Sequence, residues 1–315
     1  MEIKFLDRDN FQAYIPELVD LFKLCYKKKV HYYYSAAYFK WRQLYNPFEE
    51  TLTSVVIEQD RVVASYSGFP CLMNINNKKV MAFYALNAAT HPDYKGKGYF
   101  YKLAEGLTNF AKGKGYEIII GFPNYNSHRI VVRKLGRKDI YEIPTMMMDL
   151  IENKAHLPVT APTDNEFSLD YEQFASPTDL NSIQKNQAYL KWRYADNPVE
   201  DYTNFVVADG KQVTSFMVVK KYMDRLNIID MQTNSPDQCD FLLQQAVNFA
   251  HSLKLKSIST WAPRHHYFHT LCEKCGFINN SPVTYFTIKN LSDDRLKIST
   301  NYSDWYVQSG DFNAY

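Results

Sequence analysis

A short segment rich in glycine and lysine is the part of this sequence best suited to chemistry. It reads Pro92-Asp93-Tyr94-Lys95-Gly96-Lys97-Gly98-Tyr99-Phe100. Glycine lets the backbone approach a ligand closely and turn its N–H groups outward. A helix that begins here would add amides without an internal partner, and its dipole favours an anion. With two lysines beside those amides, the segment predicts a cradle for a phosphate or pyrophosphate group.

The segment matches neither of two common phosphate-binding motifs. A Walker loop would place Lys and then Ser or Thr after its second glycine, but Tyr99 and Phe100 stand there. The dinucleotide fingerprint G-x-G-x-x-G does not occur in the chain. An ordinary turn between a strand and a helix is the alternative interpretation.

The hydrophobic pattern predicts the elements that would position this segment. An apolar stretch over 79–90 predicts a strand before it, and apolar residues at helical spacing predict a helix over about 99–112 after it. The other elements expected in this half are a helix over 10–26, strands over 52–58, 61–69 and 117–122, and a helix over 126–135.

The chain contains two copies of one pattern. Tyr38-Phe39-Lys40-Trp41-Arg42 is followed by Asn46-Pro47, and Tyr189-Leu190-Lys191-Trp192-Arg193 by Asn197-Pro198, with the same internal spacing. Further along, Pro92 matches Pro236, Phe110-Ala111 matches Phe249-Ala250, Pro123 matches Pro263, and Leu135-Gly136 matches Cys275-Gly276. The second copy is expected to repeat the elements as helices near 178–190, 238–253 and 265–275 and strands over 204–208, 212–221, 224–233 and 256–261.

The second copy lacks the glycine and lysine segment. Pro92 and Phe110 are 18 positions apart, whereas Pro236 and Phe249 are 13 apart. The five missing residues coincide with 94–98, so the second copy is not expected to bind a phosphate in the same way. We expect it to be a degenerate repeat that shapes the acceptor site or stabilises the first copy.

Length and repeat together predict two tandem domains of the α/β class, each a mixed, mostly antiparallel sheet flanked by helices. At 315 residues the chain is long enough for about two domains. The expected boundaries are a first domain over 1–152, a linker over 153–165 with two prolines, and a second domain over 166–315.

Composition narrows the class of partner. The net charge is +2, which argues against a nucleic-acid partner. No apolar run approaches the roughly 18 residues of a membrane span, and the start of the chain is too charged for a signal peptide. Five cysteines in a chain of this length favour reduced thiols and a cytoplasmic location. Cys272 and Cys275 lack the further ligands of a zinc site, so no metal is expected.

The segment and its flanking elements resemble the acetyl-coenzyme A loop of the GCN5-related N-acetyltransferases, the GNAT superfamily, and the repeat resembles a tandem-domain subgroup. In the family pattern Arg/Gln-x-x-Gly-x-Gly/Ala, Lys95 takes the first position and Gly98 that of the central glycine. Phe100 departs from the final small residue. Asn126-Ser127 and Lys134-Leu135-Gly136 also resemble the family's later helix.

The resemblance implies an N-acetyltransferase that uses acetyl-CoA, or another acyl-CoA, to acylate the amine of a small molecule such as an amino sugar. The backbone of Ala89 and Thr90 would pair with the pantetheine arm, and Asn126 and Ser127 would lie beside that arm and the thioester. The pyrophosphate would be held by the amides of Gly96, Lys97, Gly98, Tyr99 and Phe100, with Lys95 and Lys97 supporting its charge.

The usual acid and base of the family are missing. Many members carry a Glu on the strand before the loop, but residues 84–89 contain no carboxylate. Many carry a Tyr four residues before the glycine that ends the last helix, and Val132 stands there. The remaining candidates for proton transfer are His91, Tyr84, Tyr125 and His128, or a chain of water molecules.

Other residues have two interpretations each. Arg42 is duplicated with its motif, which favours scaffold packing, with acceptor binding as the alternative. Asp311 would order a substrate amine or a sugar hydroxyl, or belong to a packed C-terminal strand. His265-His266 would belong to a metal or catalytic site, or to a solvated helix start, which is favoured because adjacent side chains point apart.

Two other functions are compatible with the same fold. One is a FemABX-like aminoacyl transferase, which uses aminoacyl-tRNA. The other is a non-catalytic scaffold or sensor that binds acyl-CoA. The intact Gly-Lys-Gly loop and the low net charge weigh against the first. The sequence leaves the oligomeric state open.

Overall fold

The chain folds into two compact units, and neither is a continuous stretch of sequence. The computed structural model describes residues 1–315 except 27–33, 49, 151–156, 176–178, 294 and 313–315, and the side chains of Tyr141 and 281–283. Unit 1 comprises Met1–Ile140, Asp196–Val199 and Tyr285–Thr300. Unit 2 comprises Tyr141–Ala195, Glu200–Thr284 and Asn301–Tyr315.

These units differ from the continuous domains expected over 1–152 and 166–315. Strand β6 (Lys138–Asp149) follows the last helix of unit 1 but pairs antiparallel with β11 (Ser257–Trp261) of unit 2. Strand β12 (Ile278–Asn290) follows the last helix of unit 2 but pairs with β5 (Ile118–Gly121) of unit 1. Each sheet is therefore completed by a strand from the other half of the sequence. Of the expected linker, residues 153–156 lie outside the described residues.

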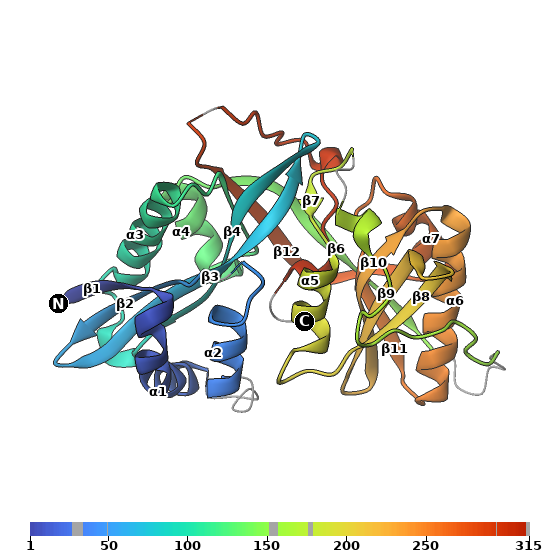
Figure 1. The fold of residues 1–315 in the computed structure, drawn as a ribbon, viewed down its shortest axis with the longest axis horizontal. Coiled ribbons are helices and arrows are strands. Elements are labelled where there is room, and N and C mark those ends of the chain that lie inside the picture. Colours follow the sequence, from blue (N-terminus) through green and yellow to red (C-terminus); the bar gives the residue numbers. More distant parts are fainter. Residues whose placement is uncertain (27–33, 49, 151–156, 176–178, 294, 313–315) are drawn as a thin grey trace. The chain divides into compact units, whose positions relative to one another are not determined.

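Unit 1 contains a mixed, mostly antiparallel sheet with helices on both faces, as predicted. The strand order is β1-β2-β3-β4-β5-β12, and only β4 and β5 run parallel. Helices α1 and α2 lie on one face of this sheet and helices α3 and α4 on the other (Figure 1). The remaining bounds are β1 (Glu2–Leu6), β2 (Leu52–Glu58), β3 (Arg61–Ile75), β4 (Lys78–Thr90), α1 (Arg8–Cys25), α2 (Ala36–Gln43), α3 (Tyr99–Gly113) and α4 (Tyr125–Arg133).

The helices of unit 1 begin where the sequence supplies a cap. The Asp7 carboxylate accepts a hydrogen bond from the Asn10 amide at 2.9 Å, and the Asn10 side chain accepts one from the Asp7 amide, a reciprocal capping box. Ser35 caps α2 in the same manner through the Tyr38 amide, at 3.1 Å. Along α3 the buried apolar residues recur at helical spacing and pack on the sheet. The predicted helix over 99–112 is thereby confirmed within one residue.

Unit 2 has the same layered arrangement. Its strand order is β6-β11-β10-β9-β8, with β10 and β11 parallel. One core cluster joins α6 and α7 to one sheet face, and another lies on the opposite face beside α5. The bounds are β7 (Ser182–Ile183), β8 (Thr203–Asp209), β9 (Gln212–Tyr222), β10 (Arg225–Thr233), α5 (Gln187–Leu190), α6 (Pro236–Ser252) and α7 (Tyr267–Cys275). The helix expected near 178–190 is shorter, because it begins at the Asn186 cap, and it continues as a π-helical turn over Lys191–Ala195.

Each sheet contains a fork, where two parallel neighbours stop pairing. In unit 1, β4 and β5 pair over Ala82–Ala85 and Ile118–Gly121 and then separate, and β4 carries a one-residue bulge at Asn87. In unit 2, β10 and β11 pair over Arg225–Ile228 and Ser257–Thr260 and then separate, with a bulge between Ile228 and Asp230. We call these points the unit 1 fork and the unit 2 fork.

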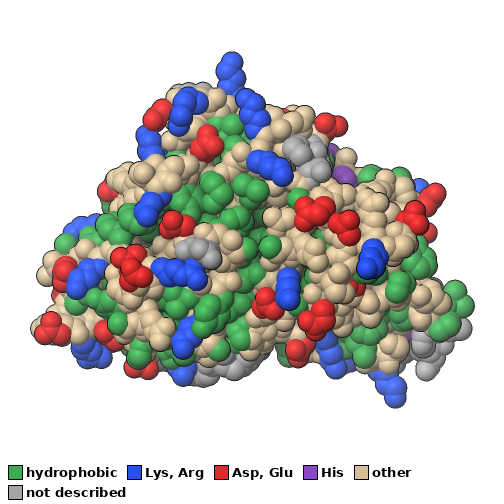
Figure 2. Space-filling view, viewed as in Figure 1, with side chains coloured by type: hydrophobic (Ala, Val, Ile, Leu, Met, Phe, Trp, Pro, Cys, Tyr) green, Lys and Arg blue, Asp and Glu red, His purple; other side chains and the backbone are tan. Residues whose placement is uncertain are grey.

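The surface and the helix lengths agree with the composition. Positive and negative side chains are interspersed over the face drawn in Figure 2, as expected for a net charge of +2. Within the described part of the chain, no helix combines the length and the apolar character needed to cross a membrane.

Candidate functional site

The glycine and lysine segment forms an exposed loop between β4 and α3. A short 3₁₀ turn, η1 (Pro92–Tyr94), follows the strand, and the His91 Nδ1 atom accepts a hydrogen bond from the Asp93 amide at 3.3 Å. Gly96 and Gly98 have φ angles of 81° and 76°, in the left-handed region where a side chain is strained. Among the described residues, no hydrogen bond uses the amides of residues 96–98. The loop therefore offers unpaired N–H groups at the beginning of α3.

The two lysines of the loop are held differently. Lys95 is exposed. The Lys97 ammonium lies 4.4 Å from the centre of the Tyr94 ring and 3.9 Å from a carboxylate oxygen of Glu58. Glu58 also accepts a hydrogen bond from the Tyr99 hydroxyl. Glu58 therefore fixes one cation of the loop and the first residue of α3 at the same point.

The backbone of β4 beyond its bulge presents alternate residues to the unit 1 fork. The His91 amide donates to the Val63 carbonyl at 2.9 Å, so the groups of Ala89, two residues earlier, also face β3. The groups of Ala88 and Thr90 face the fork instead. Of the predicted pair, Thr90 is thus placed toward the fork and Ala89 is not.

The end of α1 contacts the same edge of β4. The Tyr26 hydroxyl donates to the Ala88 carbonyl at 2.7 Å, and the Cys25 thiol donates to the Thr90 carbonyl at 3.2 Å. Burial raises the pKa of Cys25, which keeps the thiol protonated as a donor. The carbonyls on this edge are occupied, and the amides of Ala88 and Thr90 are the groups directed into the fork.

Asn126 and Ser127 lie in the first turn of α4, directly after β5. The Asn124 side chain caps this helix by accepting hydrogen bonds from the Asn126 and Ser127 amides at 3.0 and 3.1 Å. The Ser127 hydroxyl also donates to the Asn124 side chain at 3.2 Å. The cap places the Asn126 side chain on the exposed surface at the start of the helix.

The structure does not bring the four candidates for proton transfer together. Tyr84 is 1% exposed, with its ring edge-on to Phe69 at 4.8 Å and to Phe122 at 5.7 Å, which is a packing role. His91 caps the η1 turn through its ring nitrogen. Tyr125 is 84% exposed at the start of α4.

His128 is the best oriented of these candidates. Its Nε2 atom lies 2.7 Å from a carboxylate oxygen of Asp139, and its ring stacks on Tyr285 at 3.9 Å. A carboxylate in this position fixes the tautomer of an imidazole. Sequence reasoning missed Asp139 and Tyr285, which come from the beginning of β6 and from β12.

Arg42 lies inside the aromatic core of unit 1. It is 1% exposed, and its guanidinium lies 4.8 to 5.4 Å from the ring centres of Tyr38, Trp41 and Phe69. Its Nη2 atom donates to the Tyr38 hydroxyl at 3.4 Å. This surrounding of rings matches the scaffold interpretation better than contact with an acceptor.

Comparisons with known proteins agree with this geometry. Residues 8–136 match the family model of the acetyltransferase (GNAT) domain. The matched residues include β4, the loop, α3, β5 and α4, but not Asp139 or Tyr285. A search of curated proteins found no match to this chain.

Solved structures show the same fold over nearly the whole chain. A GCN5-related N-acetyltransferase from Anabaena variabilis has a TM-score of 0.64 at 14% identity, covering 92% of this chain and 73% of that one. A probable N-acyltransferase of unknown function from Enterococcus faecalis has 0.62 at 9% identity, with the same two coverages. The Saccharomyces cerevisiae N-myristoyltransferase with bound myristoyl-CoA has 0.63 at 12% identity, covering 91% and 82%. The fold is therefore shared with GNAT acetyltransferases.

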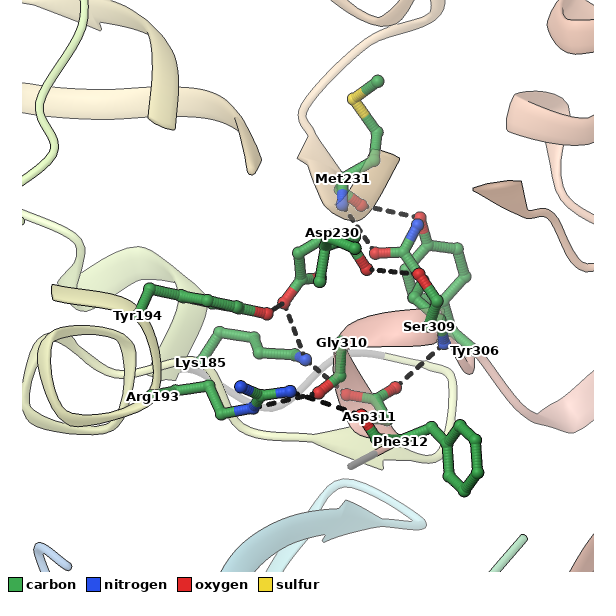
Figure 3. Close-up of polar contacts among 12 residues, drawn as sticks. Lys185, Arg193, Tyr194, Asp230, Met231, Tyr306, Ser309, Gly310, Asp311 and Phe312 are labelled. Atoms are coloured by element: carbon green, nitrogen blue, oxygen red, sulfur yellow. Dashed lines mark hydrogen bonds and ion pairs between the residues drawn. The ribbon is translucent and has the colours of Figure 1, made fainter. Parts of the chain in front are cut away.

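Unit 2 contains a buried ion cluster. The Lys185 ammonium pairs with Asp230 at 2.9 Å and with Asp311, and all three side chains are buried (Figure 3). Burial acts to lower the pKa of Lys185, but the two carboxylates outweigh it and the pKa is raised. Burial raises the pKa of Asp311. The Asp311 carboxylate is held by Lys185 inside unit 2, and contact with a substrate stays a prediction.

The C-terminal segment Tyr306–Asp311 fills the unit 2 fork, and we call it the C-terminal plug. The Gln308 side chain accepts from the Met231 amide at 2.6 Å, and the Tyr306 hydroxyl donates to the Met231 carbonyl at 2.7 Å (Figure 3). The Ser309 hydroxyl lies 3.1 Å from the carbonyl oxygens of Ile228 and Ile229. Backbone groups of β10 at the fork are thus bonded to the C-terminal plug.

Arg193, the counterpart of Arg42, holds the end of this plug. Its Nε atom donates to the Gly310 carbonyl at 3.3 Å and its Nη2 atom to the Phe312 carbonyl at 3.2 Å (Figure 3). A methyl group on Gly310 would collide with the Tyr194 hydroxyl and lie 3.1 Å from the Ile229 carbonyl oxygen. Sequence reasoning missed Lys185 and Asp230; a carboxylate inside the apolar strand 225–233 was the available signal.

The histidines and cysteines that the sequence analysis considered in unit 2 cap a helix or pack against other residues. His266 caps α7 by accepting from the Phe268 amide at 3.2 Å, and burial lowers the pKa of His266 to about 4. The His265 ring lies edge-on to Tyr302 at 4.8 Å. Cys272 is buried in α7 beside Cys275, and burial raises the pKa of both thiols. Among the described residues, no group of three or more His, Cys, Asp or Glu is arranged to hold a metal.

Proposed function

We propose that the chain is an acyl-CoA-dependent N-acyltransferase that moves an acetyl group onto the amine of a small molecule such as an amino sugar. The observation that carries the proposal is the loop between β4 and α3. It presents the unpaired amides of residues 96–98 on two left-handed glycines, beside two lysines and the unit 1 fork. These are the groups that recognise a pyrophosphate.

The rest of unit 1 supplies places for the other parts of acyl-CoA. The pyrophosphate would lie on the amides of residues 96–100, near the cations of Lys95 and Lys97. The pantetheine arm would then enter the fork, where the amides of Ala88 and Thr90 are directed. Asn126 and Ser127, after β5, border the opposite side. Acyl-CoA supplies the activated acyl group as a thioester, and the chain binds and orients it.

Unit 2 is proposed not to bind acyl-CoA. It lacks the five loop residues, and its fork contains the C-terminal plug bonded to Met231, Ile228 and Ile229. We therefore expect one acyl-CoA site per chain.

Calorimetry with acetyl-CoA tests the site. We expect one molecule bound per chain, and at least tenfold weaker binding by Gly98→Val, because a branched side chain at a φ of 76° strains the cradle. Gly210→Val is the matched control, since Gly210 also has a positive φ, of 59°, but lies in a hairpin of unit 2. It should lower the melting temperature and leave acetyl-CoA binding unchanged. Absence of binding by the natural sequence, or full binding by Gly98→Val, would overturn the proposal.

Release of free thiol from acetyl-CoA then tests catalysis. Glucosamine, lysine and spermidine serve as probes for an amino sugar, an amino acid and a polyamine. Thiol release that depends on one of them supports N-acetyl transfer and identifies the acceptor class. Binding without release from any probe favours a scaffold or sensor, and aminoacyl-tRNA-dependent transfer favours a FemABX-like enzyme.

A further inference from the structure

Arg137 is a buried cation in unit 1 that has no role in the candidate site described above. It follows Gly136 at the end of α4 and is 5% exposed. Its Nη2 atom donates to the Tyr66 hydroxyl at 2.8 Å. Among the described residues, no carboxylate lies within 4.0 Å of its guanidinium.

A buried guanidinium without a counter-charge is unfavourable. Removing such an ion from water costs several kcal/mol, which an ion pair would offset in part. A charged neighbour, Lys289, makes the situation worse, because it is also a cation. Burial and the charge of Arg137 lower the pKa of Lys289. Arg42 is also buried and has no carboxylate within 4.0 Å among the described residues, but aromatic rings lie around its guanidinium, whereas the Arg137 guanidinium borders the unit 1 fork.

The guanidinium lies at the vertex of the unit 1 fork. Gly121 is the last residue of β5 that pairs with β4, opposite Ala85. A methyl group on Gly121 would collide with the Arg137 Nη1 atom and lie 3.5 Å from the Ala85 carbonyl oxygen. Only a glycine leaves room for Arg137 at this point.

The same contacts connect Arg137 to the loop. The Tyr66 ring packs edge-on against Phe100, the second residue of α3, at 5.6 Å. Tyr66 and Ala85 share one core cluster with the buried residues of α3, so Arg137 lies on the sheet face that α3 covers. An arm that enters the fork from the loop would therefore end near the guanidinium.

The second copy provides an internal comparison. Leu135-Gly136-Arg137 corresponds to Cys275-Gly276-Phe277. Both glycines have a positive φ, and Phe277 is 2% exposed in the core of unit 2. An apolar residue therefore suits this position of the fold, and the cation occurs only in the copy that has the loop.

We propose that Arg137 is a catalytic residue that stabilises the negative charge developing on the thioester during acyl transfer. The inference rests on the proposed function. The amine nitrogen forms a bond to the carbonyl carbon, the C–S bond breaks, and its electron pair leaves on sulfur. The proton lost by nitrogen passes through water to sulfur, so that the products are an amide and a free thiol. Arg137 stays protonated and donates hydrogen bonds throughout.

This role substitutes for the missing hydroxyl of the α4 helix. Val132 has no group that could donate to the leaving sulfur. A guanidinium can donate hydrogen bonds without losing its own proton.

The variant Arg137→Met tests the proposal. We expect the kcat of acetyl-CoA-dependent thiol release with the responsive probe amine to fall about 10²- to 10³-fold, the usual loss for one oxyanion donor. The Kd of acetyl-CoA should stay within about threefold, since the pyrophosphate is held by the loop. The melting temperature should be unchanged or higher, because an unpaired buried ion is replaced by an apolar side chain of similar length. Arg137→Lys should restore part of kcat.

Lys289→Met is the matched control. It removes a neighbouring, half-buried cation whose ammonium donates to the Leu135 carbonyl at 2.7 Å. Its kcat should stay within about twofold, which separates a specific donor from a general effect of positive charge.

Three outcomes contradict the assignment of Arg137. The first is a kcat of Arg137→Met within threefold of the natural sequence. The second is a fall in melting temperature and in acetyl-CoA affinity that matches the fall in kcat, which indicates a packing role. The third is natural protein that binds acetyl-CoA but releases no thiol with any probe. Natural protein that does not bind acetyl-CoA contradicts the proposed function itself, before Arg137 is considered.

Discussion

The two forks of this chain have the same backbone arrangement, but the chain itself is bonded at one of them and unpaired amides face the other. In unit 2, backbone groups of β10 at the fork are bonded to the C-terminal plug. In unit 1 the amides of Ala88 and Thr90 face the fork beside a loop of unpaired N–H groups. Separated strands in a protein interior must satisfy their backbone groups with some partner. One copy uses its own chain for this, and the other is suited to a ligand.

The buried charges differ in the same way. Lys185 is matched by the carboxylates of Asp230 and Asp311, as a stable interior requires. Arg137 has a tyrosine hydroxyl and no carboxylate within ion-pair distance among the described residues. Lys185 is neutralised by its carboxylates and stabilises the fold. Arg137 has no such partner in the described part of the chain and can therefore stabilise a negative charge that develops during a reaction.

The largest expected effect comes from breaking the ion cluster of unit 2. Lys185→Met would leave Asp230 and Asp311 buried together without a cation, and we expect a loss of about 3–5 kcal/mol in the free energy of unfolding. Urea unfolding measures it. Lys185→Met combined with Asp230→Asn and Asp311→Asn should recover most of the loss. A destabilisation below about 1 kcal/mol would show that the cluster does not anchor the plug.

Filling the vertex of the unit 1 fork should affect activity more than folding. Gly121→Ala would displace the Arg137 guanidinium, and we expect kcat for thiol release to fall about 100-fold, or about 2.7 kcal/mol in activation free energy. The double variant Gly121→Ala with Arg137→Met should regain stability and remain as inactive as Arg137→Met alone. If the kcat of Gly121→Ala equals that of the natural sequence, the position of Arg137 at the fork does not contribute to the reaction.

A change of pH should weaken unit 2 through His266, whose ring lies 4.6 Å from that of Tyr306 in the plug. Burial lowers the pKa of His266 from 6.5 to about 4 in the folded chain. The unfolded chain therefore binds the proton first, and stability present above pH 6.5 is lost as the pH falls toward 4. After allowance for partial exposure we expect a loss of about 2 kcal/mol at pH 4.

The variant His266→Asn isolates this term, because asparagine also caps a helix but does not titrate. Unfolding free energies of the natural and variant chains at pH 7.5 and 4 are compared. An identical pH dependence in the two chains would contradict the assignment to His266.

The smallest effect concerns the fit of the plug. Gly310→Ala would bring a methyl group against Tyr194 and the Ile229 carbonyl, at an expected cost of about 1–2 kcal/mol. Acetyl-CoA affinity should not change, since the residues involved belong to unit 2. A loss of affinity in the folded variant would show that the plug contributes to the cofactor site.

Local features of the fold could be predicted from the sequence. Helix α3 and strand β10 begin and end within one residue of their predicted bounds, because each has a clear apolar period between turn residues. The loop stands out because two glycines and two lysines lie between a strand and a helix. The repeat also indicated that both halves share one arrangement, and the mixed α/β class is confirmed.

Pairing and burial could not be predicted in this way. No bounds were predicted for β6 or β12, and an apolar stretch does not indicate which sheet a strand joins, so continuous domains were expected. A single Lys or Arg in a sequence gives no sign of being buried, which hid Lys185 and Arg137. The one available signal for Arg137 was Phe277 at the matching position of the repeat. The catalytic and binding residues in unit 1 remain predictions.

Strands β6 and β12 each pair with a strand from the other half of the sequence, and this limits the order in which the chain can fold. Strand β5, an apolar run of Ile118, Ile119 and Ile120 before Gly121, has its neighbour β12 more than 150 positions later. During synthesis this edge stays unpaired until β12 has left the ribosome, and exposed apolar edges invite aggregation. A fragment that ends near residue 152 would keep the entire loop and still lack a finished sheet. The proposed acyl-CoA site is thus encoded early in the chain, whereas its sheet is completed late.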